Sequence, residues 1–322
     1  MNNSNKENNN YINYNNINYI EKDIVIIGAG AAGMCAALNA ARGGKSVVII
    51  EKNSFGGQIA YSPKVENFPS IESISGMDFS TNLFTQIINW GVQFELETVL
   101  NVEKENGLFI TTTDYNKYLS KVVIIATGVS HRKLNLEHED ELVGKGISYC
   151  AICDGAFFEG KEVAVIGDAN TALQYALMLS NTSPKVYLCT LFDKFFGEKI
   201  YEERIKNKEN IEVIQNISLQ KYLYDDNLKG LVFKNTKTSE ELELKVEGVF
   251  IAIGQIPHNE IFSNLVDLDK NGYIITNENM ETKTEGLYAI GDCRVKKIRQ
   301  LTTAVADGSI VSFNAINYIE SK

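Results

Sequence analysis

Two cysteines and an aspartate in residues 146–158 have the types and spacing that thiol chemistry requires. In the sequence "GISYCAICDGAFF", Cys150 and Cys153 are separated by two residues, and Asp154 follows directly. A CxxC pair of this kind is half of a zinc site, a structural pair or a redox-active dithiol. The short spacing lets the two thiols form a disulfide, and a helix N-terminus lowers the pKa of a thiol.

The zinc alternative lacks ligands elsewhere in the chain. A structural zinc ion needs about four ligands, usually as paired Cys or Cys and His residues. The sequence has no second CxxC, and its three histidines show no ligand spacing: His131, His138 and His258. We therefore expect no metal. A structural pair remains open at this point beside the redox dithiol.

A glycine-rich turn near the N-terminus predicts a nucleotide site. Residues 23–33, "DIVIIGAGAAG", place an apolar run before Gly28-x-Gly30-x-x-Gly33, a helical pattern continues to about Arg42, and "SVVIIEK" supplies a second strand that ends at Glu51. In such a βαβ unit the first glycine permits the tight turn, the second lets the backbone approach a pyrophosphate, and the third allows close helix packing. The acid at the end of the second strand is placed to bind ribose hydroxyls.

Further motifs identify a family. From about residue 22 to the C-terminus the chain resembles the low-molecular-weight thioredoxin reductase family of flavoproteins. The motifs that carry the resemblance are Gly56-Gly57-Gln58, Glu66-Asn67-Phe68-Pro69, Ala126-Thr127-Gly128, Gly291-Asp292 and Arg299-Gln300, together with the CxxC and its trailing Asp-Gly.

The resemblance implies FAD as the cofactor of the first site. It places Asp292 at the ribityl and phosphate groups and Arg299 with Gln300 over the isoalloxazine. The residues that it assigns to cofactor binding are Gly28, Gly30, Ala31, Ala32, Gly33, Glu51, Lys52, Gly57, Gln58, Asn67, Ala126, Thr127, Gly128, Gly291, Asp292, Arg299 and Gln300.

The same resemblance gives the CxxC segment a redox role. It makes Cys153 the flavin-proximal thiol, Cys150 the thiol that attacks the disulfide of a protein substrate, and Asp154 the proton donor and acceptor. Disulfide exchange fits these roles, because one thiolate must attack and one leaving thiol must be protonated. The alternative for Asp154 is a helix cap.

A second Rossmann-like segment departs from the family pattern. Residues 161–180, "KEVAVIGDANTALQYALMLS", predict a strand, a turn and a helix, and in the family this inserted domain binds NADPH. Here Ala169 replaces the middle glycine, and Asp168 adds a negative charge where phosphates belong. The family's arginines for the 2′-phosphate are replaced by Leu191, Phe192 and Phe196.

This combination of an intact flavin site and a damaged NADPH site resembles the ferredoxin-dependent flavin thioredoxin reductases. We therefore expect reduced ferredoxin as the electron donor and thioredoxin as the substrate. A docking site for an acidic ferredoxin is a hypothesis based on the basic run "CRVKKIRQ", which contains Arg294, Lys296, Lys297 and Arg299. The alternatives are an NADPH-dependent reductase with an altered pocket, an FAD-dependent oxidase of small dithiols, and a redox-responsive binding protein.

The expected architecture is α/β, with two nested Rossmann-like domains, the second inserted in the first. We expect a disordered Asn-rich leader in residues 1–20, an FAD domain in residues 21–130 and 249–322, and an NAD(P)H-like domain with a vestigial nucleotide site in residues 131–248. The resemblance also implies a homodimer.

Charge and hydropathy exclude other classes. The 322 residues carry a net charge of −10, which argues against nucleic acid as a partner. Residues 24–41 are uncharged, but their glycines and β-branched residues favour a strand, turn and helix over a membrane span. We therefore expect a cytoplasmic protein without a membrane segment.

Overall fold

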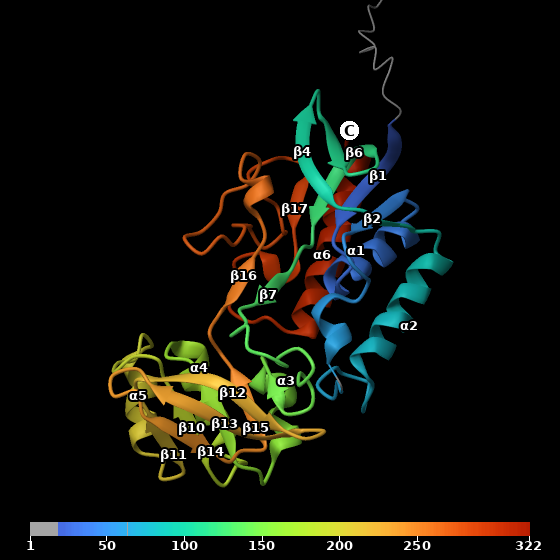
Figure 1. Ribbon diagram of the computed structural model, residues 1–322. Helices are drawn as coiled ribbons and strands as arrows, with labels where there is room; N and C mark the ends of the chain where they lie inside the picture. The colour runs from blue at the N-terminus through green and yellow to red at the C-terminus, as the bar shows by residue number, and fades with distance from the viewer. Residues whose placement is uncertain (1–18, 63) are drawn as a thin grey trace, which may run out of the picture.

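The computed structural model describes residues 19–62 and 64–322, which form two α/β units (Figure 1). The first unit contains both ends of the described chain, and the second is built from its middle part. This arrangement confirms the predicted fold class of two nested Rossmann-like units. Nearly all of the expected leader, residues 1–18, lies outside the described residues, but Ile20 already belongs to the first strand.

The first unit has a sheet of seven strands in the described part of the chain, in the order β3-β2-β1-β6-β5-β4 with β17 beside β6. β4, β5 and β6 form an antiparallel meander, and the other strand pairs of this sheet are parallel. The bounds are β1 (Ile20–Ile27), β2 (Val47–Glu51), β3 (Gln93–Leu96), β4 (Val99–Glu105), β5 (Leu108–Thr113), β6 (Lys117–Ile125) and β17 (Leu287–Ala289).

The apolar run of β1 is continuous because both of its faces are buried. Ile24 and Ile26 face a core shared with α1 (Ala31–Arg42), α2 (Gly76–Asn89) and α6 (Leu301–Glu320). Val25 and Ile27 face a second core, which the β4–β5 meander and residues 262–274 cover. Burial on both sides is what parallel strands in an α/β layer require. The 18 uncharged residues from 24 to 41 are therefore β1, a turn and α1.

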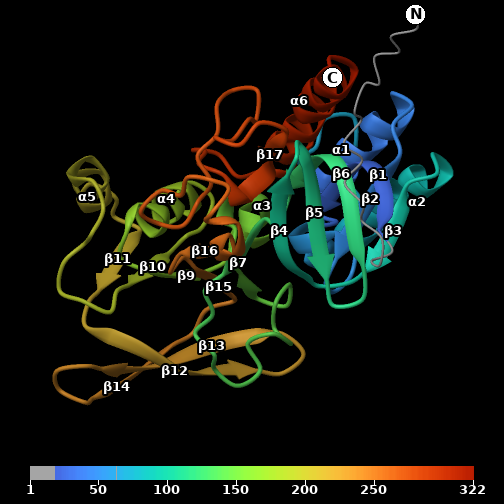
Figure 2. The same cartoon turned by 90° about the horizontal axis from the view of Figure 1, so that it is seen from above.

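The second unit has a parallel sheet in the order β11-β10-β9-β15-β8 and an antiparallel sheet in the order β12-β13-β14. The antiparallel sheet covers one face of the parallel sheet, and three helices cover the other. Figure 2 shows the antiparallel sheet below the strands of the parallel sheet. The bounds are β8 (Ile147–Ser148), α3 (Ala151–Asp154), β9 (Val163–Ile166), α4 (Asn170–Leu179), β10 (Val186–Cys189), α5 (Lys199–Lys206), β11 (Ile211–Ile214), β12 (Ile217–Tyr224), β13 (Leu228–Asn235), β14 (Glu241–Leu244) and β15 (Gly248–Ile251).

Two short strands carry the chain between the units. β7 (Val129–His131) leaves the first unit, β16 (Gln255–Pro257) returns to it, and the two pair antiparallel. The expected domain boundary at residue 249 is wrong, because β15 pairs with β8 and β9 in the second sheet. The apolar run "VFIAIG" looks like a linker in sequence, yet its first half is a buried central strand.

Four short 3₁₀ helices complete the described structure: η1 (Gly57–Tyr61), η2 (Gly155–Phe158), η3 (Glu260–Phe262) and η4 (Gly291–Cys293). Among the described residues no helix is long and apolar enough to cross a membrane.

Candidate active site

Cys150 and Cys153 form a disulfide at the start of α3. Cys150 is the N-cap residue of this helix, and its Sγ accepts a hydrogen bond from the backbone N–H of Cys153 at 3.2 Å. An N–H donor that points at a sulfur atom stabilises the thiolate after reduction. Within the described residues, no group of three or more His, Cys, Asp or Glu side chains is arranged to hold a metal ion.

Asp154 is tied to the disulfide through Ser148. The Ser148 hydroxyl donates to Asp154 Oδ2 at 2.6 Å, and the backbone N–H of Cys150 donates to Ser148 Oγ at 3.0 Å. The other carboxylate oxygen, Oδ1, is buried without a partner. Burial raises the pKa of Asp154 above its ordinary value, and the Ser148 hydrogen bond opposes this effect. The Asp154 side chain caps neither neighbouring helix, so the structure does not support the helix-cap alternative.

The first glycine-rich turn has the geometry that a bound dinucleotide requires. Gly28 has a φ of 109°, and a Cβ on it would lie 2.4 Å from the carbonyl oxygen of Ala126. A Cβ on Gly33 would lie 2.0 Å from the carbonyl oxygen of Gly28. Gly30 differs, because no atom lies within 4 Å of its Cβ position. Gly28 and Gly33 therefore serve packing, whereas the open side of Gly30 leaves room for a phosphate.

The N-terminus of α1 and Glu51 border this open space. Gly30 caps α1 without a side-chain hydrogen bond, and Ala31 and Ala32 follow as its first, buried residues. Glu51 accepts the N–H of Ala29 with Oε2 at 2.9 Å and the N–H of Asn53 with Oε1 at 3.0 Å. The carboxylate of Glu51 therefore lies against the glycine-rich turn, where each oxygen keeps a lone pair for ribose hydroxyls. The side chain of Lys52 is exposed.

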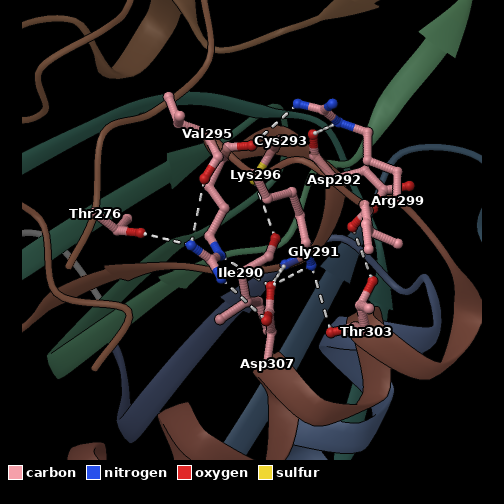
Figure 3. Close-up of polar contacts among 12 residues, drawn as sticks. Thr276, Ile290, Gly291, Asp292, Cys293, Val295, Lys296, Arg299, Thr303 and Asp307 are labelled. Carbon is pink, nitrogen blue, oxygen red and sulfur yellow. Dashed lines mark hydrogen bonds and ion pairs between the residues drawn. The ribbon is translucent and has the colours of Figure 1, made fainter. Parts of the chain in front are cut away.

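A buried carboxylate oxygen without a partner marks the expected ribityl position. Asp292 follows Gly291, whose φ is 71°, in η4. Its Oδ1 atom is buried and has no hydrogen-bond partner among the described residues. Burial raises the pKa of Asp292, while Lys296 and Arg299, drawn with it in Figure 3, lower it. A buried polar atom without a partner is costly. A cofactor hydroxyl that donates to Asp292 satisfies it, so these residues fit FAD.

The remaining expected flavin contacts come from three further segments. Gly57 packs against Gly30, so that a Cβ on Gly57 would lie 3.1 Å from the Cα of Gly30. Gln58 donates its side-chain amide to the Val129 carbonyl. The Asn67 amide donates to the side chain of Gln300 at 3.2 Å.

Arg299 and Thr127 have partners that the sequence did not indicate. Arg299 donates Nε to the Asp292 carbonyl at 3.2 Å, and its guanidinium lies 4.1 Å from the centre of the Tyr273 ring. Thr127 Oγ1 donates to Asn259 Oδ1 at 3.2 Å, and the Asn259 amide donates to the Cys293 carbonyl at 2.9 Å. Gly128 follows with a φ of 63°. No sequence motif marks Asn259 or Tyr273, because their partners are distant in the chain.

The second glycine-rich turn is built differently. A Cβ on Gly167 would lie 2.5 Å from the Ala252 carbonyl oxygen, so this glycine serves packing. Ala169 is the N-cap residue of α4, where the family pattern has glycine, and it makes no side-chain cap. Burial raises the pKa of Asp168, and the Asp168 carbonyl accepts the N–H of Phe196 at 2.7 Å. An acidic side chain and an aromatic residue therefore adjoin the turn.

Apolar side chains stand where the family places arginines. Leu191, Phe192 and Phe196 are 48%, 47% and 55% exposed, and the rings of Phe192 and Phe196 meet edge to face at 5.4 Å. Lys194 lies 5.0 Å above the Phe196 ring. Exposed phenyl rings offer no positive charge to a 2′-phosphate. These three positions therefore lack the charge that the sequence comparison with the family pattern predicts to be missing.

The basic run 294–299 is not the free cationic surface that the ferredoxin-docking hypothesis requires. Arg294 and Lys296 both form ion pairs with Asp307, and their side chains are only 14% and 9% exposed. Arg299 stacks on Tyr273, which leaves Lys297 as the exposed cation of the run. The docking hypothesis is therefore wrong for Arg294 and Lys296, because the helix that follows supplies an internal counter-charge.

Comparison with known proteins identifies the family of the chain. The family described as pyridine nucleotide-disulphide oxidoreductase matches residues 22–308. A thioredoxin reductase of Bacillus subtilis is 38% identical, with 92% of this chain and 95% of the relative covered. A "34.2 kDa protein in rubredoxin operon" of Clostridium pasteurianum is 37% identical, with 93% and 98% covered.

A solved structure agrees with the whole described arrangement. The thioredoxin reductase of Streptococcus pyogenes superposes with a TM-score of 0.91 at 34% identity, over 95% of this chain and all of the other. Together with the open glycine turn, the unpartnered Asp292 and the disulfide beside Asp154, these matches show that the chain belongs to the thioredoxin reductase family of flavoproteins, whose cofactor is FAD.

Proposed function

We propose that the protein reduces the disulfide of a thioredoxin through FAD and the Cys150–Cys153 pair. The observation that supports this proposal is the hydrogen-bonded chain from Cys150 through Ser148 to Asp154. FAD, when bound and reduced by the electron donor, would supply the two electrons that, with two protons, convert the disulfide into two thiols. Side chains of the second unit carry out the later steps of thiol–disulfide exchange.

In this proposal Cys150 is the attacking thiol. Its thiolate attacks one sulfur of the thioredoxin disulfide, a mixed disulfide forms, and the other thioredoxin sulfur leaves as a thiolate. Cys153 then attacks Cys150 Sγ, which restores the intramolecular disulfide and releases the second thioredoxin sulfur. Asp154 donates a proton to a leaving thiolate and accepts one when the pair is reduced again, a role that its raised pKa suits.

The electron donor in this proposal is reduced ferredoxin rather than NADPH. Ala169, Asp168 and the three apolar residues at positions 191, 192 and 196 support the loss of NADPH. Each lost charge-assisted hydrogen bond removes about 1.5–3 kcal/mol, so several together weaken binding by about a thousandfold or more. A plant-type ferredoxin lies about 130 mV below thioredoxin, which for two electrons is about 6 kcal/mol downhill.

A pyridine nucleotide remains the second candidate donor. The family that matches the chain is described by that donor, and the named relatives from Bacillus and Streptococcus are thioredoxin reductases. Lys194, beside Phe196, supplies one cation at the position in question. The homodimer implied by the resemblance and the cytoplasmic location expected from the hydropathy stay predictions.

Anaerobic reduction of the purified flavoprotein distinguishes the donors. The loss of flavin absorbance is followed after addition of NADPH, NADH or reduced ferredoxin, each at micromolar concentration. We expect rapid bleaching by ferredoxin alone, followed by thioredoxin reduction. Rapid, saturable bleaching by NADPH contradicts the ferredoxin proposal and supports the second candidate. Flavin reduction by dithiols followed by fast reoxidation with oxygen instead indicates a dithiol oxidase.

A further inference from the structure

Asp307 is a buried carboxylate on α6 that none of the steps above uses. It is 4% exposed, and both of its oxygens accept hydrogen bonds (Figure 3). Oδ2 receives the backbone N–H of Gly291 at 2.9 Å, Arg294 Nε at 2.9 Å and Lys296 Nζ at 2.8 Å, and Oδ1 receives Arg294 Nη2 at 3.2 Å. Asp307 thus connects α6 to the turn that carries Asp292.

The carboxylates of Asp307 and Asp292 differ in their hydrogen-bond partners. Asp307 has two cationic partners, which hold its pKa below the ordinary value although burial acts in the other direction. Asp292, next to the anchored Gly291, has a buried oxygen, Oδ1, without a hydrogen-bond partner in the part of the chain that the structure describes. Lys296 is close enough to Asp292 to lower its pKa, yet its ammonium group is bound to Asp307.

We propose that Asp307 is a positioning residue, which holds Lys296 away from Asp292 so that the Asp292 carboxylate stays free for a hydroxyl of the cofactor. Without the Asp307 charge, Lys296 is a buried cation without a counter-ion, and such a cation pairs with an available carboxylate. Asp292 then becomes its partner. Arg294 has other acceptors, since its Nη1 also donates to Thr276 Oγ1 at 3.2 Å and to the Val295 carbonyl at 3.4 Å. Lys296 Nζ also donates to the Thr303 carbonyl at 3.4 Å, but this neutral acceptor does not balance its charge.

This inference rests on FAD as the cofactor and is independent of the electron donor. The variants Asp307→Asn, Lys296→Met and the double variant are prepared as apoproteins, and FAD is titrated back while flavin fluorescence is measured. We expect Asp307→Asn to weaken FAD binding about tenfold, because one charge-assisted hydrogen bond is displaced. Lys296→Met should bind FAD within about threefold of wild type. The double variant should regain the affinity of Lys296→Met, because the competing cation is gone.

A matched control separates positioning from general stability. Ser312 is buried on the same helix and donates to the Gly308 carbonyl at 2.6 Å. Ser312→Ala should lower the melting temperature of the apoprotein without changing FAD affinity. An Asp307→Asn apoprotein that is less stable but binds FAD like wild type overturns the proposal, as does a double variant that stays weak. A wild-type protein that binds no FAD contradicts the proposed function itself.

If the Asp307→Asn apoprotein does not fold, FAD release from the loaded protein replaces the titration. We then expect release about ten times faster from Asp307→Asn than from the double variant. Equal release rates overturn the proposal.

Discussion

At the scale of single residues, the two sulfurs of the disulfide differ in their hydrogen-bond donors. Cys150 Sγ accepts an N–H, and its own backbone N–H is linked through Ser148 to Asp154. No comparable donor to the Cys153 sulfur occurs among the described residues. Since an N–H donor favours the thiolate, this contact supports the proposed role of Cys150 as the nucleophile toward an external disulfide.

The cysteine roles predict opposite trapping behaviour. After reduction, Cys153→Ser should form a stable mixed disulfide with thioredoxin, because Cys150 attacks and no thiol remains to resolve the product. Cys150→Ser should form little or none. Both variants should lose thioredoxin turnover. Non-reducing gel electrophoresis with peptide mass analysis identifies the linked cysteine, and trapping in Cys150→Ser alone would reverse the assignment.

Asp154 predicts a pH dependence with a defined sign. Its pKa is raised by burial, so the protonated acid persists to higher pH than in an ordinary aspartate and is lost as the pH increases through that pKa. Thioredoxin reduction by pre-reduced protein should therefore slow with rising pH on account of Asp154. Asp154→Asn should lower the rate by about a hundredfold and remove this pH dependence. Stopped-flow measurements across pH test both effects, and an unchanged profile in the variant excludes Asp154 as the proton donor.

At the scale of elements, the β7–β16 pair joins the units and carries a partly buried histidine. His131, the last residue of β7, stacks on Tyr149 with ring centres 4.9 Å apart and planes at 15°. Tyr149 directly precedes Cys150 in sequence. The crossing strand therefore packs against the segment that leads into the redox disulfide.

His131 predicts how the stability of this contact depends on pH. Burial lowers its pKa to about 4 from the ordinary 6.5, so the unfolded chain binds the extra proton between these values. Stability is then fully present above pH 6.5 and falls as the pH decreases toward 4. A shift of this size corresponds to about 3 kcal/mol. His131→Phe keeps a ring on Tyr149 and should flatten the profile. Urea unfolding from pH 4 to 7 measures the free energy of unfolding of wild type and variant. Parallel pH profiles of the two proteins would contradict the effect.

How much the sequence predicts depends on how local the cause is. The glycine turn, α1, β2 and the Cys150–Cys153 pair depend on near neighbours, and the structure places them where the pattern indicates. β15 was missed because an apolar run does not show which sheet it joins. The Asp307 contacts were missed because their partners lie 11 to 16 residues away and meet only through the turn before α6. One feature of the sequence does mark Asp307, because it is the one charged residue between Gln300 and Glu320.

At the scale of the whole molecule, the cofactor site and the disulfide belong to different units that touch. Lys64, in the first unit, has its Nζ 5.5 Å from the ring centre of Phe157. Phe157 belongs to η2 and follows Cys153 by four residues. Reduction therefore has to pass from the first unit to the second. In the family, NADPH binds to the second unit. Residues of that NADPH site can therefore change without loss of the dithiol chemistry.

This separation predicts that NADPH use can be rebuilt at the second unit alone. The variant combines Ala169→Gly with arginines in place of Leu191, Phe192 and Phe196, which reopens the backbone and restores charge for the 2′-phosphate. Anaerobic flavin reduction by NADPH should accelerate by about a hundredfold or more, because each recovered charge-assisted bond contributes about 1.5–3 kcal/mol. NADH, which lacks that phosphate, should gain far less.

The matched control places an arginine at an exposed apolar site nearby that is not part of the turn. Ile200, on α5, is 46% exposed, and Ile200→Arg should leave both nicotinamide rates unchanged. A fourfold variant that bleaches no faster with NADPH than wild type shows that the barrier lies elsewhere, in the path between the units. Equal gains for NADH and NADPH show that the added charge acts without recognising the 2′-phosphate. Only a gain selective for NADPH supports the view that this chain lost its nucleotide donor through those four positions.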